Sequence, residues 1–221
     1  LDFGESIVHT LSYQQARHFN VPVKGAYVAN PGYLLGAAGL PRGAVVLNID
    51  GKDIAGLADF EKAISALGNG DRVAMRYTTI DDPNGSQLRS VRMDRRWFPG
   101  RRCLRNDGSG IWDCVDLTAG PPSKPVTGGS TTFAKQADPR AAKLGASLVG
   151  VSFDMPYSVS GITERNYYGT GLLVDVKRGL VVVDRNTVPV SIGDVRLTFA
   201  GTLEIPGRGE LVHPLHNLAV V

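Results

Sequence analysis

The sequence of 221 residues contains no apolar run near the roughly 18 residues that a membrane-spanning helix needs. Its first residues carry neither a basic start nor an apolar stretch, so a secretory signal peptide is not expected. These two absences predict no membrane partner. Disorder along the whole chain is also excluded, because a hydrophobic fraction of 43% is typical of globular proteins. Since the chain opens on Leu instead of Met, we expect it to be part of a larger protein.

Acidic residues are scarce in one segment, although the net charge of +3 is too small to predict a polyanionic partner. Between positions 89 and 105 Asp94 is the only acid, whereas seven arginines lie there: Arg89, Arg92, Arg95, Arg96, Arg101, Arg102 and Arg105. Alternation along residues 88–96 predicts that several of them share a solvated strand face. We expect this face to contact an acidic peptide or a partner domain. A nucleic-acid partner is less expected, because such sites combine aromatic residues with a strongly basic domain.

Cysteine is rare too, with two residues that flank a turn over 107–110. In a symmetric hairpin Cys103 and Cys114 lie opposite each other, with Cβ atoms about 4.5–5.5 Å apart, which is near bonding range. A disulfide would indicate an oxidising compartment, and two free thiols on one face are the alternative. No second pair of zinc ligands is near, so we expect no metal and no other cofactor. The run Asp107-Gly108-Ser109-Gly110 resembles a protease nucleophile loop, but a hairpin turn explains it better.

Glycine and proline are plentiful instead, at 27 and 13 residues, and they predict many turns and short strands. In the first hundred residues Ser12 and Gln15 have the spacing of a helix capping box. An amphipathic helix is predicted by apolar residues at helical spacing: Leu57, Phe60, Ile64 and Leu67. Strands are predicted over 24–29, 44–49, 72–79 and 87–93, with a short helix over 34–39. This order predicts a small α+β sandwich.

The second half of the chain reads as short strands after a linker rich in Gly and Pro. The expected strands are Leu148–Asp154, Tyr157–Ile162, Gly171–Val176, Leu180–Asp184, Asp194–Phe199, Thr202–Ile205 and Leu218–Val221. Their spacing predicts an antiparallel barrel. We therefore expect a first domain over 1–97, a β-hairpin extension over 98–118, a linker over 119–146 and an incomplete barrel over 147–221.

The first domain contains, in order, the segments Gly25–Val28, Pro31-Gly32, Ala37–Leu40, Val45–Lys52 and Leu57–Phe60. In this order and spacing they resemble a PDZ domain, and most closely the permuted PDZ domains of HtrA/Deg serine proteases. The resemblance implies that an exposed sheet edge accepts an extended peptide as an added strand.

By this resemblance the groove has three parts. They are a loop that cradles the peptide carboxylate (Asp2, Phe3, Gly4, Glu5), a receiving strand (Ser6, Ile7, Val8, His9) and a groove helix (Phe60, Ile64, Leu67). Glu5 departs from the family pattern, in which an apolar residue is usual. A carboxylate beside a carboxylate site lowers affinity by like-charge repulsion. A structural PDZ domain that packs against its neighbours is therefore the open alternative.

The second half contains Gly169–Asp175, Gly179–Val188 and a final Asn217–Val221. These segments resemble the first barrel of a trypsin-like HtrA/Deg protease, and the whole chain is similar to the long branch that carries a second, degenerate protease domain. The resemblance places Asn186 at the general-base histidine and Asn217 at the orienting aspartate. Asparagine cannot take a proton from a serine hydroxyl near pH 7, so we expect no hydrolysis by this chain.

Histidine offers no clear metal site. His213 and His216 lie three residues apart, and on a strand their side chains would point to opposite faces and could not share an ion.

These patterns together predict a non-catalytic peptide-binding and assembly segment of an HtrA/Deg-like protein-quality-control serine protease. The expected partners are peptide or unfolded-protein C-termini, other domains of the same protein, and further copies in a full-length homo-oligomer. One alternative is a segment of an active endopeptidase whose triad lies elsewhere, and another is a basic adaptor for acidic partners or nucleic acid. The resemblance leaves the bacterial periplasm, the nucleus and the chloroplast open as compartments.

Overall fold

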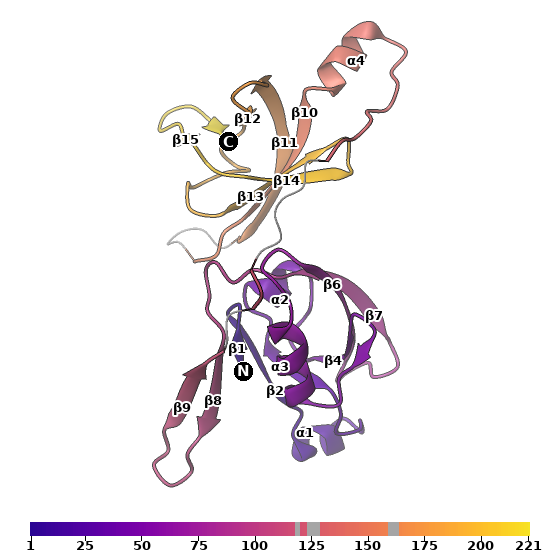
Figure 1. Cartoon of the computed structure of the whole chain (residues 1–221), viewed down its shortest axis with the longest axis vertical. Helices are drawn as coiled ribbons and strands as arrows, with labels where there is room; N and C mark the ends of the chain where they lie inside the picture. The colour runs from indigo at the N-terminus through magenta and orange to yellow at the C-terminus, as the bar shows by residue number, and fades with distance from the viewer. Residues whose placement is uncertain (118–119, 123–128, 159–163) are drawn as a thin grey trace. The chain divides into compact units, whose positions relative to one another are not determined.

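The computed structural model describes residues 1–117, 120–122, 129–158 and 164–221, and it divides into two compact units. Unit 1 covers Leu1–Val126 and unit 2 covers Thr127–Val221 (Figure 1). Within the described residues, every helix is too short or too polar to cross a membrane.

Unit 1 is built on one antiparallel sheet with helices on its faces (Figure 1). Its elements are β1 (Asp2–Phe3), β2 (Ser6–Thr10), α1 (Tyr13–His18), β3 (Ala26–Asn30), α2 (Leu34–Ala37), β4 (Ala44–Ile49), β5 (Lys52–Asp53), α3 (Leu57–Ser65), β6 (Arg72–Thr79), β7 (Gln87–Arg92), β8 (Arg101–Arg105) and β9 (Trp112–Asp116). The strand order is β7-β6-β4-β3-β2-β1-β8-β9, with β5 paired to β4. The α+β sandwich expected from the sequence is therefore present.

The two longer helices of unit 1 form for reasons that are visible in the sequence. Ser12 caps α1, because its hydroxyl oxygen accepts a hydrogen bond from the Gln15 backbone N–H at 3.1 Å. Helix α3 places Phe60 and Ile64 one turn apart on its inner face, where both are fully buried. That face lies against the sheet, whereas the intervening residues of α3 are partly or fully exposed.

The main core of unit 1 fills the space between α3, α2 and one face of the sheet. It joins Phe3 and Val8 to Phe60 and Ile64, together with residues of β3, β4 and β6. A smaller cluster lies on the opposite face, where Leu11 and Ala16 pack against alternate residues of the same strands. The sheet is thus covered on both sides.

Unit 2 is an open antiparallel half-barrel (Figure 1). Its elements are α4 (Pro139–Gly145), β10 (Leu148–Asp154), β11 (Asn166–Asp175), β12 (Leu180–Val183), β13 (Asp194–Phe199), β14 (Leu203–Gly207), β15 (Leu211–Val212) and β16 (Ala219–Val220). The order β14-β13-β10-β11-β12-β16-β15 is a path with two ends. Its core is formed by alternate residues such as Val149, Val151 and Phe153. The fold class is therefore an α+β PDZ domain followed by a mainly β half-barrel.

The structure differs from the sequence expectation in several elements. Strands β1 and β15 were not expected, and β11 begins at Asn166, several residues before the predicted start. The strand expected over 157–162 lies partly outside the described residues, as do positions 118–119 and 123–128 of the hairpin and linker segments. Part of the expected linker packs on unit 2, because the Thr131 and Thr202 hydroxyls lie 2.7 Å apart.

Candidate peptide-binding site

The outer edge of β2 is already paired. Strand β1 runs antiparallel to it, with Asp2 opposite Ile7 and Phe3 opposite Ser6. The Leu1 nitrogen donates to the Val8 carbonyl oxygen at 2.7 Å, and the Val8 N–H donates to the Leu1 carbonyl oxygen at 2.8 Å. The receiving strand expected over residues 6–9 exists, but its edge is occupied by the chain itself.

A tight turn joins β1 to β2 at the place of the expected carboxylate loop. Gly4 and Glu5 both have positive φ, at 58° and 64°, which is the conformation of a two-residue hairpin turn. The turn folds residues 1–3 back onto β2, so the loop expected over residues 2–5 takes the form of a tight hairpin turn. Glu5 is partly exposed at the tip of this turn.

Successive side chains of β2 point to opposite faces of the sheet. Ser6 and Val8 are fully buried, whereas Ile7 is 40% exposed. The His9 ring lies on the same side as Ile7, 5.0 Å from the ring of Tyr27. Four of the expected site residues share one hydrophobic cluster: Phe3, Val8, Phe60 and Ile64. Leu67 packs against this cluster.

The Ser6 hydroxyl fixes β2 to the neighbouring turn. It donates to the Pro31 carbonyl oxygen at 2.6 Å and accepts from the Leu35 N–H at 3.3 Å. Both backbone partners are thereby satisfied in the protein interior.

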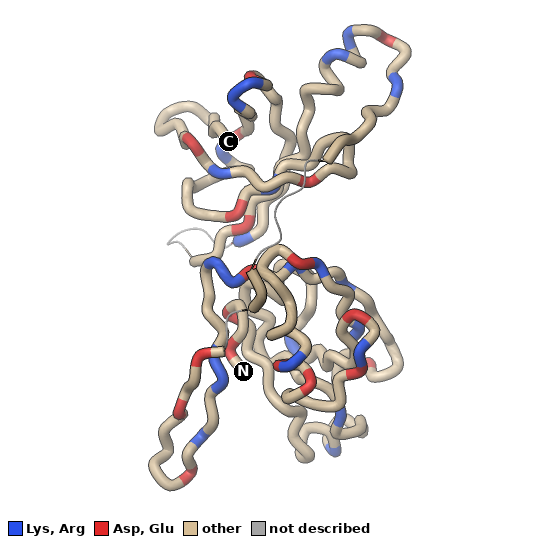
Figure 2. The backbone as a smooth tube through the Cα atoms, in the orientation of Figure 1, with Lys and Arg blue, Asp and Glu red and all other residues tan. Residues whose placement is uncertain are grey.

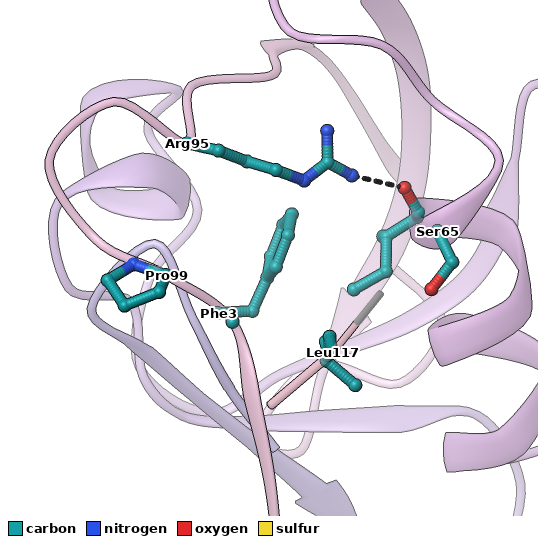
Figure 3. Close-up of a pocket in the computed structure, with 7 residues that line it drawn as sticks. Phe3, Ser65, Arg95, Pro99 and Leu117 are labelled. Atoms are coloured by element: carbon teal, nitrogen blue, oxygen red, sulfur yellow. Dashed lines mark hydrogen bonds between the residues drawn. The ribbon is translucent and has the colours of Figure 1, made fainter. Parts of the chain in front are cut away.

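A cavity of about 190 Å³ remains at the C-terminal end of α3 (Figure 3). It is lined by Phe3, Ile64, Ser65, Arg95, Pro99, Gly100 and Leu117. Figure 3 shows the Arg95 side chain crossing above the Phe3 ring, and the guanidinium carbon lies 5.6 Å from the ring centroid. The cavity thus combines apolar walls with one cation.

Arg95 also closes the end of α3. Its Nη1 donates to the Leu67 carbonyl oxygen at 2.7 Å, and its Nη2 donates to the Ile64 carbonyl oxygen at 2.6 Å. A cation at a helix C-terminus is favourable because the last carbonyl groups carry partial negative charge. Burial lowers the pKa of Arg95, and the nearby Asp71 carboxylate opposes this shift. The guanidinium remains protonated, as arginine does throughout proteins.

Arg95 was not expected at this site, because strand alternation predicted that several of the arginines share one solvated face. Strand β7 ends at Arg92, so the alternation that was expected through residue 96 stops there. Other arginines of the segment have partners within unit 1. Arg101 pairs with Asp2 at 3.0 Å, Arg102 with Glu61 at 3.6 Å, and Arg105 with Asp107 at 3.3 Å. Three of the seven arginines thus pair with carboxylates of unit 1.

The β8–β9 hairpin extends from unit 1 (Figure 1). Cys103 and Cys114 are opposite each other at its centre and form a disulfide. Figure 2 shows basic residues along β8 and acidic residues along β9, in agreement with their sequences RRCLR and WDCVD. Most of the hairpin is exposed, including Leu104, Trp112 and Val115.

A second hollow, of about 550 Å³, lies in unit 2 and contains both asparagines singled out by the sequence. Its lining residues are Tyr167, Arg185, Asn186, Pro189, Leu215, His216 and Asn217. The Asn217 side-chain oxygen accepts from the Arg185 N–H at 3.0 Å, and the Asn186 N–H donates to the Asp184 carboxylate at 2.9 Å. Two positions far apart in the sequence are thus brought to one place.

The chemistry of this second hollow is limited. Its lining residues include no carboxylate. They include one imidazole, that of His216, and one hydroxyl, the phenol of Tyr167. That phenol donates to the Glu164 carbonyl oxygen at 2.8 Å. Desolvation by burial and the Glu164 charge both raise the pKa of Tyr167. A neutral phenol with this partner is a weak base near pH 7.

The two histidines near the hollow do not lie as expected. They follow β15 in a bend, and their rings stack with centroids 4.6 Å apart. The expectation of opposite strand faces was wrong, because the chain turns directly after Val212. The Nδ1 atom of His213 accepts from the N–H groups of Leu215 and His216. In the part of the chain that the structure describes, no group of three or more His, Cys, Asp or Glu residues is arranged to hold a metal.

Comparisons with known proteins find one domain family and several relatives. The PDZ-like domain family matches residues 1–69. The chain is 35% identical, over 96% of its length, to the pro-apoptotic serine protease NMA111 of Yarrowia lipolytica. It is 30% identical to the protein of the same name from Pyricularia oryzae and 32% identical to a PDZ domain-containing protein of Schizosaccharomyces pombe, again over 96% of its length. The chain spans 21–23% of the length of these relatives.

Proposed function

Because the chain belongs to the HtrA/Deg-type family of PDZ-containing serine proteases, we propose that it is a non-catalytic peptide-binding and assembly segment of such a protease. In this proposal unit 1 binds peptides with apolar C-termini, and unit 2 packs against other domains or other copies of the full-length protein. Cleavage belongs to a triad elsewhere in the parent chain, since this segment spans less than a quarter of the length of the relative that it matches in Yarrowia lipolytica.

The cavity beside Phe3 is the observation that carries the peptide-binding role. Its apolar walls, formed by Phe3, Ile64 and Leu117, suit one apolar side chain. A volume of about 190 Å³ is below the range of sites for whole small molecules, so it fits one residue of a longer ligand. The Arg95 guanidinium has five N–H donors, and the two bonds to α3 leave others for a terminal carboxylate.

The remainder of a bound peptide would need the edge of β2. Backbone hydrogen bonds along that edge supply most of the affinity when a peptide adds to a sheet as a strand. Because β1 occupies this edge, further peptide residues bind only when β1 moves aside. Peptide binding is therefore expected to compete with the chain's own first residues.

The non-catalytic part of the proposal is supported by the second hollow. Asn186 and Asn217 line it at the positions that the family resemblance gives to the base and its orienting acid. Neither amide can accept a proton from a nucleophile near pH 7. A barrel retained without these groups is useful for packing, which favours an assembly role for unit 2.

The peptide-binding role can be tested by fluorescence anisotropy with labelled peptides that end in an apolar residue. Saturable binding is expected for peptides with a free carboxylate, and at least about tenfold weaker binding for the same peptides with an amidated C-terminus. The Leu117→Glu variant, which places a carboxylate in the cavity wall, is expected to lose affinity by a similar factor.

Leu88→Glu is the matched control, because Leu88 is 57% exposed on β7 and lies outside the cavity lining. Its affinity should equal that of the unmodified chain. Equal binding of carboxylate and amidated peptides, or no saturable binding of either, would contradict the proposed role of the cavity.

A further inference from the structure

Strand β1 lies where an extended peptide would add to β2. It forms the hydrogen bonds that such a peptide would form, and Leu1 and Phe3 are only 8% and 2% exposed in the cluster that also contains Phe60 and Ile64. We propose that β1 is a strap that closes the peptide-binding edge, and that reduction of the Cys103–Cys114 disulfide releases it. This inference rests on the proposed peptide-binding role and names its regulation.

The outer side of the strap is held by β8. Asp2 of β1 is paired with Arg101 of β8, and their side chains form an ion pair at 3.0 Å. The next residue, Arg102, reaches Glu61 on α3 at 3.6 Å. These contacts hold β8 against β1 and α3 at the same time. Both arginine side chains are 50% exposed, so each ion pair alone is weak and the contact depends on an ordered β8.

The order of β8 depends in turn on the hairpin, which has no core of its own. All five residues of β9 are exposed, and in β8 only Cys103 is partly covered. A two-stranded hairpin without a packed face is marginally stable in water. The disulfide joins the central pair of this hairpin, with two residue pairs on each side. It is therefore the strongest restraint on the pairing of β8 with β9, and through that pairing on the order of β8.

The disulfide can be reached by a reductant, since Cys114 is exposed. A thiolate of a dithiol attacks one sulfur, the S–S bond breaks, and a mixed disulfide forms. The second thiol of the reductant then displaces the cysteine. The protein gains two electrons and two protons and ends with two thiols, while the dithiol ends as a disulfide.

Loss of the cross-link weakens the hairpin and removes β8 from the outer side of β1. The strap then consists of a short strand held by its turn and by the burial of Leu1 and Phe3. An extended peptide with apolar side chains at alternate positions can replace both the hydrogen bonds and the buried side chains. Reduction thus shifts the balance from the closed edge toward the peptide-bound edge.

Hydrogen exchange of the whole chain tests this inference without a ligand. The Val8 amide reports on the strap, because it donates to the Leu1 carbonyl oxygen. The Asn106 amide reports on the hairpin through its bond to the Ile111 carbonyl oxygen, and the Asp50 amide, bonded to Ala74, is the control in the body of the sheet. Dithiothreitol is expected to accelerate exchange at Asn106 and Val8 by at least about tenfold and to leave Asp50 unchanged.

Two variants separate the loss of the disulfide from the release of β1. The double variant Cys103→Ser/Cys114→Ser should reproduce the fast Val8 exchange without reductant. Arg101→Ala, which removes the ion pair to Asp2 and keeps the disulfide, should accelerate exchange at Val8 by a smaller factor than reduction does and leave Asn106 slow. Three results with dithiothreitol would overturn the strap mechanism. The Asn106 amide could exchange faster while the Val8 amide is unchanged, or exchange at both amides could be unchanged. The third is equal acceleration of exchange at Val8 and at the control Asp50.

Peptide titration distinguishes this inference from the function on which it rests. The reduced chain is expected to bind apolar C-terminal peptides at least about tenfold more tightly than the oxidised chain. Fast Val8 exchange with no peptide binding in either state would support the strap and contradict the peptide-binding role. Peptide binding of equal strength in both states would support that role and overturn the redox control.

Discussion

Gly32 shows how one residue positions the edge of the candidate site. It has a φ of +53°, and a Cβ atom at this position would lie 2.2 Å from the Glu5 carbonyl oxygen. The turn containing Gly32 therefore contacts the backbone of the β1–β2 turn directly. Both the left-handed conformation and this close approach require glycine.

Replacing Gly32 with Ala is expected to lower the free energy of unfolding of unit 1 by at least about 2 kcal/mol, because strain and a backbone clash add together. Urea denaturation followed by tryptophan fluorescence measures this change, since both tryptophans, Trp97 and Trp112, lie in unit 1.

Gly51→Ala is the matched control for the clash. Gly51 has a φ of +80°, and a Cβ atom added there would meet no other atom within 4 Å, so only the conformational cost of about 1 kcal/mol is expected. An equal decrease in the free energy of unfolding in the two variants would show that the close approach to Glu5 does not contribute to the effect of Gly32→Ala.

Helices α1 and α4 have similar caps but different surroundings. Ser12 accepts from the Gln15 N–H at the start of α1, and Asp138 accepts from the Arg140 N–H at the start of α4. Helix α1 buries Ala16 fully in a core cluster, whereas α4 buries none of its residues. A cap contributes to the stability of a whole unit only when the helix it supports is packed there.

We therefore expect Ser12→Ala to destabilise unit 1 by about 1 kcal/mol and Asp138→Ala to change the stability of unit 2 by less than about 0.5 kcal/mol. Tryptophan fluorescence in urea measures the first effect, and amide exchange in β10 measures the second. Similar losses from both substitutions would contradict this view of α4.

The molecule as a whole combines two units with separate cores and no complete catalytic apparatus among the residues that line the second hollow. The purified chain is expected to hydrolyse casein no faster than buffer, because Asn186 and Asn217 supply no base and no orienting carboxylate. Release of soluble peptides over several hours measures this.

Casein cleavage by the purified chain would contradict the non-catalytic role. The Ser109→Ala variant then locates the activity, because Ser109 lies in the hairpin turn that resembles a nucleophile loop. Cleavage that survives this substitution would require a catalytic group elsewhere in the chain.

Local patterns were enough to predict most elements of both units. The Ser12 and Gln15 spacing predicted α1, the apolar stripe with Phe60 and Ile64 predicted α3, and alternating residues predicted most strands of the half-barrel. The family was also recognisable from the order and spacing of short segments between Gly25 and Phe60, and the comparisons agree with it. Each of these signals depends on residues that are close in sequence, where helix and strand periodicity determine which side chains share a face.

Only the tertiary structure decided the state of the candidate site. A two-residue turn at Gly4 and Glu5 returns β1 to β2, Arg95 leaves the strand pattern to reach α3, and the bend after β15 stacks His213 on His216. These arrangements depend on turn register and on packing between distant residues, which periodicity along one element does not contain. The sequence by itself determined which side chains were available for a peptide groove, and packing determined that the chain's own first strand occupies its edge.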